Sequence, residues 1–76
     1  MKLGPEHIAA LALSYDGLER SNYNFLQLGI YAEVMELTTE GLLERREANS
    51  HTSFYKITPR GERAVDEILR SSEGLI

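Results

Sequence analysis

Two histidines, His7 and His51, and six serines are the side chains of this 76-residue sequence with the greatest catalytic potential. Neither histidine has an Asp, a Glu or a second His at the spacing of a metal site, and we expect both to be exposed to solvent. No serine has a base partner at the spacing of an activated nucleophile. The sequence also contains no glycine-rich phosphate loop. We therefore expect no enzymatic activity, no metal and no cofactor.

Recognition of nucleic acid by basic side chains is the other chemistry that the residue types permit. Six of the eight lysines and arginines lie in the second half of the chain. Basic groups clustered in this way predict contacts with DNA phosphates. The alternative is that they are solvated and partly paired with Glu44, Glu47 and Glu67. The candidate DNA-binding residues are Arg45, Arg46, Lys56, Arg60 and Arg63.

The overall charge opposes this assignment, because the formal net charge is −4. A local basic patch is nevertheless sufficient for DNA binding. The sequence has no cysteine, which excludes disulfides and thiolate metal sites. Its longest apolar run, residues 8–13, is far shorter than the roughly 20 residues that span a bilayer, and no basic segment of a signal peptide precedes it. We expect residues 1–76 to form one complete globular domain in the cytoplasm, without a membrane partner.

Three helices are predicted in the first half of the chain. The first begins at Pro5 and stops at Gly17, the second covers residues 22–28 after the cap residue Ser21, and the third covers residues 30–40. Apolar residues at helical spacing predict the inward faces. These are Ile8, Leu11, Ala12, Tyr15 and Leu18 in the first helix, and Ile30, Val34 and Leu37 in the third.

A β-hairpin and a closing helix are predicted in the second half. Residues 42–48 and 53–58 flank a polar turn, and the second run has the aromatic and β-branched composition of a strand. Tyr55 and Ile57 are predicted to share the inward face. Thr58 and Pro59 form a strong helix start, so a helix follows to about residue 70 and frays from Ser71 onward. Its predicted inner stripe is Ala64, Val65, Ile68 and Leu69.

Two segments resemble passages found in winged-helix proteins. Leu37-Thr38-Thr39-Glu40-Gly41-Leu42-Leu43-Glu44-Arg45 resembles the passage from recognition helix to wing in bacterial winged-helix regulators. Tyr55-Lys56-Ile57-Thr58-Pro59-Arg60-Gly61 is similar to the passage from wing strand to closing helix in MarR-like and PadR-like proteins. The resemblance implies a small α+β winged helix-turn-helix domain. Gly41 permits the sharp turn out of the third helix, and Gly61 permits close approach to neighbouring backbone.

By this resemblance, residues 30–40 form the recognition helix, which enters the major groove of DNA in such proteins. The sequence departs from the family's habit, because this helix has no Arg, Lys, Asn or Gln to contact bases. Three glutamates would instead face phosphate and repel it. The exposed face of this helix is predicted to contain Tyr31, Ala32, Glu33, Met35, Glu36, Thr39 and Glu40.

Two functions therefore remain open. The first is a DNA-binding transcriptional regulator that contacts double-stranded DNA mainly through the wing, as a homodimer because one such domain buries little surface on DNA. The second is a module that binds a protein partner, as an adaptor or inhibitor, and does not bind DNA. Tyr31, Ala32 and Met35 beside the acidic row would form its interface, since Tyr and Met are favoured at interfaces.

Overall fold

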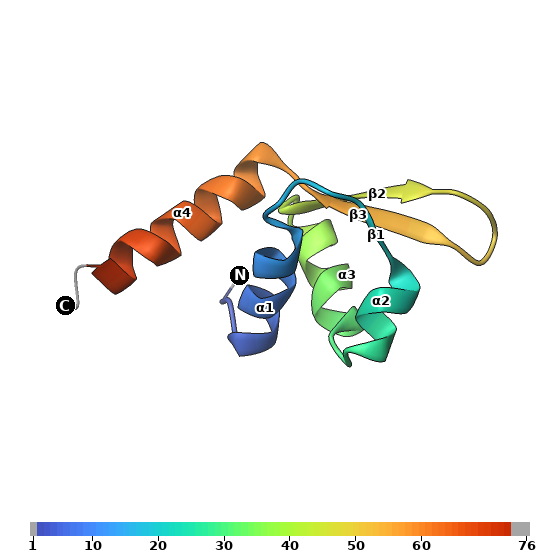
Figure 1. Ribbon diagram of the computed structural model, residues 1–76, viewed down its shortest axis with the longest axis horizontal. Helices are drawn as coiled ribbons and strands as arrows, with labels where there is room; N and C mark the ends of the chain where they lie inside the picture. The colour runs from blue at the N-terminus through green and yellow to red at the C-terminus, as the bar shows by residue number, and fades with distance from the viewer. Residues whose placement is uncertain (1, 74–76) are drawn as a thin grey trace.

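Four helices and a three-stranded antiparallel sheet make up residues 2–73, which the computed structural model describes (Figure 1). The predicted α+β class is therefore confirmed, and helices precede and follow a hairpin in the predicted order. The elements are α1 (Pro5–Ser14), β1 (Arg20–Ser21), α2 (Asn22–Gln27), α3 (Tyr31–Thr39), β2 (Leu43–Glu47), β3 (Ser53–Ile57) and α4 (Pro59–Glu73). None of these helices is long and apolar enough to cross a membrane.

The hairpin pairs β2 with β3 from Leu43 opposite Ile57 to Glu47 opposite Ser53. Alternate residues of β3 are buried, and Tyr55 and Ile57 share the inward face as predicted. β1 was not predicted, and it adds a third strand on the other side of β3. Two residues are too few to carry a period-two pattern, so no sequence signal was available for this strand.

Tyr55 lies at the centre of the core, where helices α2 and α3 meet the inner face of the sheet. Phe25 packs edge-on against its ring with the centroids 5.9 Å apart, and both side chains are fully buried. Leu37 and Val34 are buried as predicted, whereas Phe25 was not predicted as a core residue. The core contains Ala10, Leu11, Phe25, Ile30, Val34, Leu37, Leu43, Tyr55 and Ile57.

The predicted inward face of α1 is wrong except for Leu11. The buried face contains Ala10 and Ser14 instead, while Tyr15 is 43% exposed and Leu18, beyond the helix, is 63% exposed. Small residues face α3, and the Ser14 hydroxyl is satisfied because it donates to Ala10 O at 2.9 Å. A polar residue can therefore occupy this buried position without an orphaned donor. The sequence pattern favoured the larger apolar stripe, which lies on the surface.

Helix α4 leaves the core and projects from one end of the molecule, which measures 45 × 23 × 21 Å (Figure 1). Val65 and Ile68 were predicted to be buried, but they are only half-buried. The helix also continues to Glu73, beyond its predicted end near residue 70, and the rest of the segment predicted to fray lies outside the described residues. Gly61 in its first turn is buried, and the Gly61 amide donates to Thr58 Oγ1 at 3.0 Å. The predicted cap at Thr58 is thereby confirmed.

Candidate nucleic-acid interface

Arg45 lies where the hairpin meets α3. It is paired across the hairpin with Tyr55, and its Nε donates to Ser53 Oγ at 2.9 Å. Within residues 2–73 its guanidinium makes no ion pair. The Tyr55 hydroxyl donates to Met35 Sδ at 3.6 Å, and the Tyr31 ring packs edge-on against Tyr55 with the centroids 6.5 Å apart. Arg45 is thus close to the exposed face of α3.

Tyr55, beside Arg45, has an uncharged hydroxyl group. Burial, followed by the interaction with Tyr31, raises the pKa of Tyr55 to about 12. The nearby positive charge of Arg45 acts in the opposite direction but has the smaller effect. Tyr55 therefore remains neutral at physiological pH. The corner between hairpin and α3 combines one guanidinium with neutral hydrogen-bonding groups.

Arg46 lies on the opposite face of the hairpin and has partners within the molecule. Its Nε and Nη2 atoms donate to the Glu19 carboxylate at 2.9 and 3.1 Å, and its guanidinium carbon lies 4.9 Å from the centroid of the Phe54 ring. The hydrogen bonds from Arg46 lower the pKa of Glu19. Lys56 is exposed on the same face, paired across the hairpin with Glu44.

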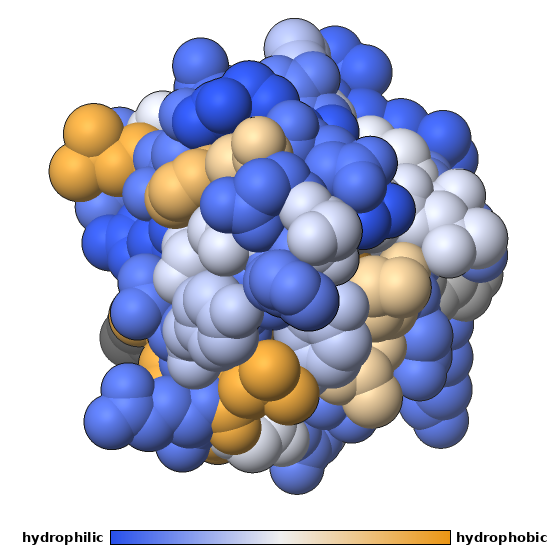
Figure 2. Space-filling model, turned by 90° about the vertical axis from the view of Figure 1, so that its right-hand side faces the viewer, coloured by the Kyte–Doolittle hydropathy of each residue, from blue (hydrophilic) through white to orange (hydrophobic). Residues whose placement is uncertain are grey.

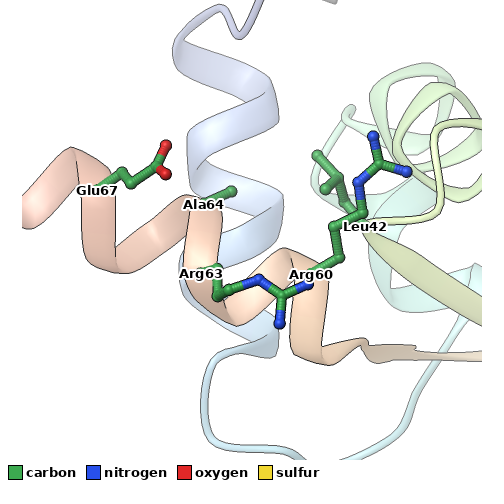
Figure 3. A pocket seen from close by; sticks show the side chains of 5 residues that line it. All are labelled: Leu42, Arg60, Arg63, Ala64 and Glu67. Atoms are coloured by element: carbon green, nitrogen blue, oxygen red, sulfur yellow. The ribbon is translucent and has the colours of Figure 1, made fainter.

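Arg60 and Arg63 lie at the start of α4, at the end of the sheet away from the hairpin turn. Figure 3 shows Arg60 extending alongside Leu42, with Arg63 directed toward it. Together with Ala64 and Glu67, these residues line an open hollow of about 280 Å³. The five candidate basic residues are therefore distributed over three places: the α3 corner, the outer face of the hairpin and the start of α4.

The exposed face of α3 is acidic and partly apolar. Ala32, Met35, Glu36, Thr39 and Glu40 are exposed, and Tyr31 and Glu33 are half-buried. This face has one partner that was not predicted from the sequence. His7 of α1 contacts Glu36. The Gly4 amide donates to His7 Nδ1 at 3.1 Å, so the ring proton is on Nε2, which donates to Glu36 Oε2 at 3.0 Å.

The two histidines differ in exposure. The His7 side chain is only 14% exposed, so the prediction that it faces solvent is wrong. His51 is exposed, as predicted, and lies in the hairpin turn. Its carbonyl oxygen accepts hydrogen bonds from Asn22 Nδ2 and Tyr23 Oη of α2. In the part of the chain that the structure describes, no three His, Asp or Glu side chains are grouped to hold a metal ion.

Figure 2 views the molecule from the end at which the hairpin turn and α2 lie. This face is mainly hydrophilic, and its apolar side chains form separate patches rather than one continuous area. Stable protein interfaces usually contain a contiguous apolar centre, whereas nucleic-acid interfaces are more polar. The end of the molecule that carries the hairpin turn therefore shows no continuous apolar area in this view.

No protein-family model matches the sequence, and no curated protein sequence matches it. The fold is similar to that of RosR from H. salinarum, in a structure grown from NaBr, with a TM-score of 0.79 and 20% sequence identity over 93% of this chain and 74% of that one. A complex structure of hsRosR-S1 gives a TM-score of 0.77 and 21% identity over 92% of this chain and 72% of that one. At these identities the likeness shows a shared fold.

Proposed function

We propose that this chain is a winged-helix DNA-binding regulator of transcription, with the hairpin as the wing and α3 as the recognition helix. The order of its elements and its likeness to the RosR fold support the winged-helix assignment. The DNA proposal rests on the position and the free charge of the Arg45 side chain. This side chain has no carboxylate partner in residues 2–73 and lies beside the helix that would enter the major groove.

Position selects Arg45 among the basic residues, because Lys56, Arg60 and Arg63 also make no ion pair within residues 2–73 but do not lie beside α3. Its Nε is engaged by Ser53, which leaves both terminal nitrogens of the fork to donate to a phosphate. Arg46 would first have to leave Glu19, and the carboxylates of α3 would repel the DNA backbone. The wing, and not the recognition helix, would therefore supply the attraction, and α3 would add few contacts to bases.

A salt-dependent titration of mixed duplex DNA tests this proposal. Each phosphate contact steepens the dependence of log K on log salt by about 0.9 units, so Arg45→Ala should reduce the slope by about one unit. Arg70→Ala, which removes an equal charge from the far end of α4, should leave it unchanged. Equal slopes for the two variants, or no binding by the parent chain at low salt, would refute the proposal.

Replacing Glu33 and Glu36 together with glutamine should strengthen binding to all duplexes alike. The change removes two negative charges from α3 and keeps the side-chain shapes, so repulsion of phosphate falls. The gain should shrink as salt rises, because exposed charges more than about 8–10 Å apart are screened at physiological ionic strength. Affinity unchanged at low salt would show that α3 does not face DNA.

The proposed regulator is a homodimer. Apolar side chains are exposed on α1, just after it and on α4, among them Ile8, Tyr15 and Leu69. α4 contacts α1 through the Tyr15 hydroxyl, which donates to Asp66 Oδ1 at 2.6 Å. A second copy packed on these residues would bury them. Sedimentation equilibrium should give twice the chain mass, and Leu69→Glu should reduce it to that of one chain.

The acidic face of α3 favours a second candidate function, a module that binds a protein partner. Met35 is 42% exposed beside the carboxylates of Glu36 and Glu40, so an apolar contact is surrounded by negative charge. A basic partner would complement this face. Failure of every duplex to bind at low salt, together with binding of a basic protein that Met35→Ala abolishes, would favour this candidate over DNA.

A further inference from the structure

The start of α2 is hydrogen-bonded to the hairpin turn and to the strand that follows it. Asn22 Nδ2 and Tyr23 Oη donate to the carbonyl oxygen of His51 at 3.3 and 3.0 Å. The Ser53 amide donates to Asn22 Oδ1 at 3.1 Å. Ser53 is only 6% exposed, and its hydroxyl accepts from Arg45 Nε. Asn22 is therefore joined through one residue to the guanidinium proposed to contact DNA.

The position of Asn22 in the sheet explains why these bonds matter. β1 pairs with β3 through Arg20 opposite Tyr55 and Ser21 opposite Phe54. In this register the next residue, Asn22, lies opposite Ser53, but there the backbone turns into α2 and the strand ends. The Asn22 side chain accepts the Ser53 amide in place of a strand carbonyl. The Asn22 side chain thus continues the pairing of β1 with β3 by one hydrogen bond.

Beyond this point the hairpin has only two strands. An isolated two-stranded hairpin is marginally stable in water, so the turn at residues 48–52 would move without further support. Within that turn, the Ala48 and Asn49 amides donate to Thr52 O at 2.9 and 3.2 Å, which closes the loop but does not attach it to the helices. The attachment is made by Asn22 and Tyr23. Figure 1 shows β1 leading directly into α2 beside the hairpin.

We propose that Asn22 is a positioning residue for the wing: its carboxamide bridges Ser53 and His51, holds the hairpin against α2 and thereby orients the Arg45 guanidinium. The consequence for DNA affinity rests on the proposed function, whereas the consequence for the hairpin does not. The test is therefore carried out first on the full chain without DNA. A labelled sample reports hydrogen exchange of the Ser53 amide and of the Arg45 Nε–H, and ¹⁵N relaxation of residues 48–52.

Asn22→Ala should accelerate exchange at Ser53 by about tenfold, as expected for the loss of a partly buried hydrogen bond. It should also accelerate exchange of the Arg45 Nε–H, because the Ser53 hydroxyl is held less firmly. Asn22→Asp keeps the acceptor for the Ser53 amide and lacks the donor to His51, so Ser53 exchange should stay slow while the turn becomes more mobile. Asn24→Ala is the matched control. It lies in the same helix, and its side chain makes no hydrogen bond within residues 2–73, so exchange should match the parent chain.

On duplex DNA, Asn22→Ala should weaken binding by about tenfold in the parent chain and by much less in the Arg45→Ala background, because the two residues act through one contact. Ser53 exchange within twofold of the parent, or equal acceleration in Asn24→Ala, would overturn the proposal. Should Asn22→Ala fail to fold, Asn22→Ser is used in its place. Serine suits a helix start, but its side chain is one bond too short to bridge Ser53 and His51, so the same outcomes are expected. Altered Ser53 exchange without any DNA binding by the parent chain would uphold the positioning of the hairpin and refute the DNA function.

Discussion

Replacing Gly61 with alanine should destabilise the protein strongly, although alanine is the better helix former. Gly61 is in the first turn of α4, where the helix crosses the backbone that leaves α3. An added Cβ would overlap Leu42 O and lie 2.7 Å from Ile57 Cγ1 and 3.1 Å from the Leu42 carbonyl carbon. Leu42 O also accepts the Thr58 amide at 3.1 Å, so it cannot move away without losing that bond.

The expected magnitude follows from three contributions. Alanine gains about 1 kcal/mol in helix propensity. Overpacking against a rigid neighbour costs about 1–3 kcal/mol, and disturbing the bonds at Thr58 costs a further 1–3 kcal/mol or so. At the middle of these ranges the net loss is about 3 kcal/mol, a large part of the roughly 4–11 kcal/mol expected for 76 residues. At about 4–8 °C per kcal/mol for a domain of this size, Tm should fall by more than 10 °C.

Thermal unfolding followed by circular dichroism measures this difference. Gly4→Ala is the control, because a Cβ at Gly4 would meet its nearest atom, His7 Nδ1, at an ordinary 3.5 Å. Its Tm should fall by only a few degrees, as expected for a changed helix cap. If Gly61→Ala melts within about 2 °C of the parent, α4 does not approach Leu42 as closely as described, and the reasoning is wrong.

Leu37→Ala should reduce the free energy of unfolding by about 2–5 kcal/mol, because Leu37 is fully buried and alanine would leave a cavity; a Tm shift of only a degree or two would contradict this. The hydrogen bond from Arg20 lowers the pKa of Asp16 to about 2. The ionised Asp16 therefore stabilises the folded state fully above the pKa of about 4 that the group has in the unfolded chain. This stabilisation is lost as the pH falls through about 2. Asp16→Asn should therefore lower Tm at pH 7 and have little effect near pH 2; an equal loss of Tm at both pH values would show that the ion pair is not responsible.

Local signals in the sequence were sufficient for the four helices and the hairpin, and they placed most boundaries within a few residues. Gly17, Gly29 and Gly41 follow or end helices at positive φ, as their positions between periodic segments predicted. Gly61 was also predicted to permit close approach of backbone, and the contact with Leu42 confirms it. The helix ends at these glycines depend on residues near one another in the chain, so pattern and turn chemistry can reveal them.

The orientation of the elements was decided by tertiary packing. The apolar stripe of α1 that contains Tyr15 predicted its inward face, but close packing against α3 selected the smaller face with Ala10 and Ser14. α4 has a strong apolar stripe, yet contacts with the rest of the molecule are made by its first half, and Leu69 is exposed. Periodicity shows that a helix has a face to bury, and it does not show which neighbour covers that face.

The candidate site shows the same division. The sequence alone determined which residues are basic and that they gather in the hairpin and α4. Only the tertiary structure decided that Glu19 engages Arg46, that Arg45 lies beside α3, and that Asn22 accepts the Ser53 amide. These partners are separated by up to 31 residues along the chain. No local pattern encodes such contacts, because they form when a turn into α2 and the register of β3 bring the two side chains together.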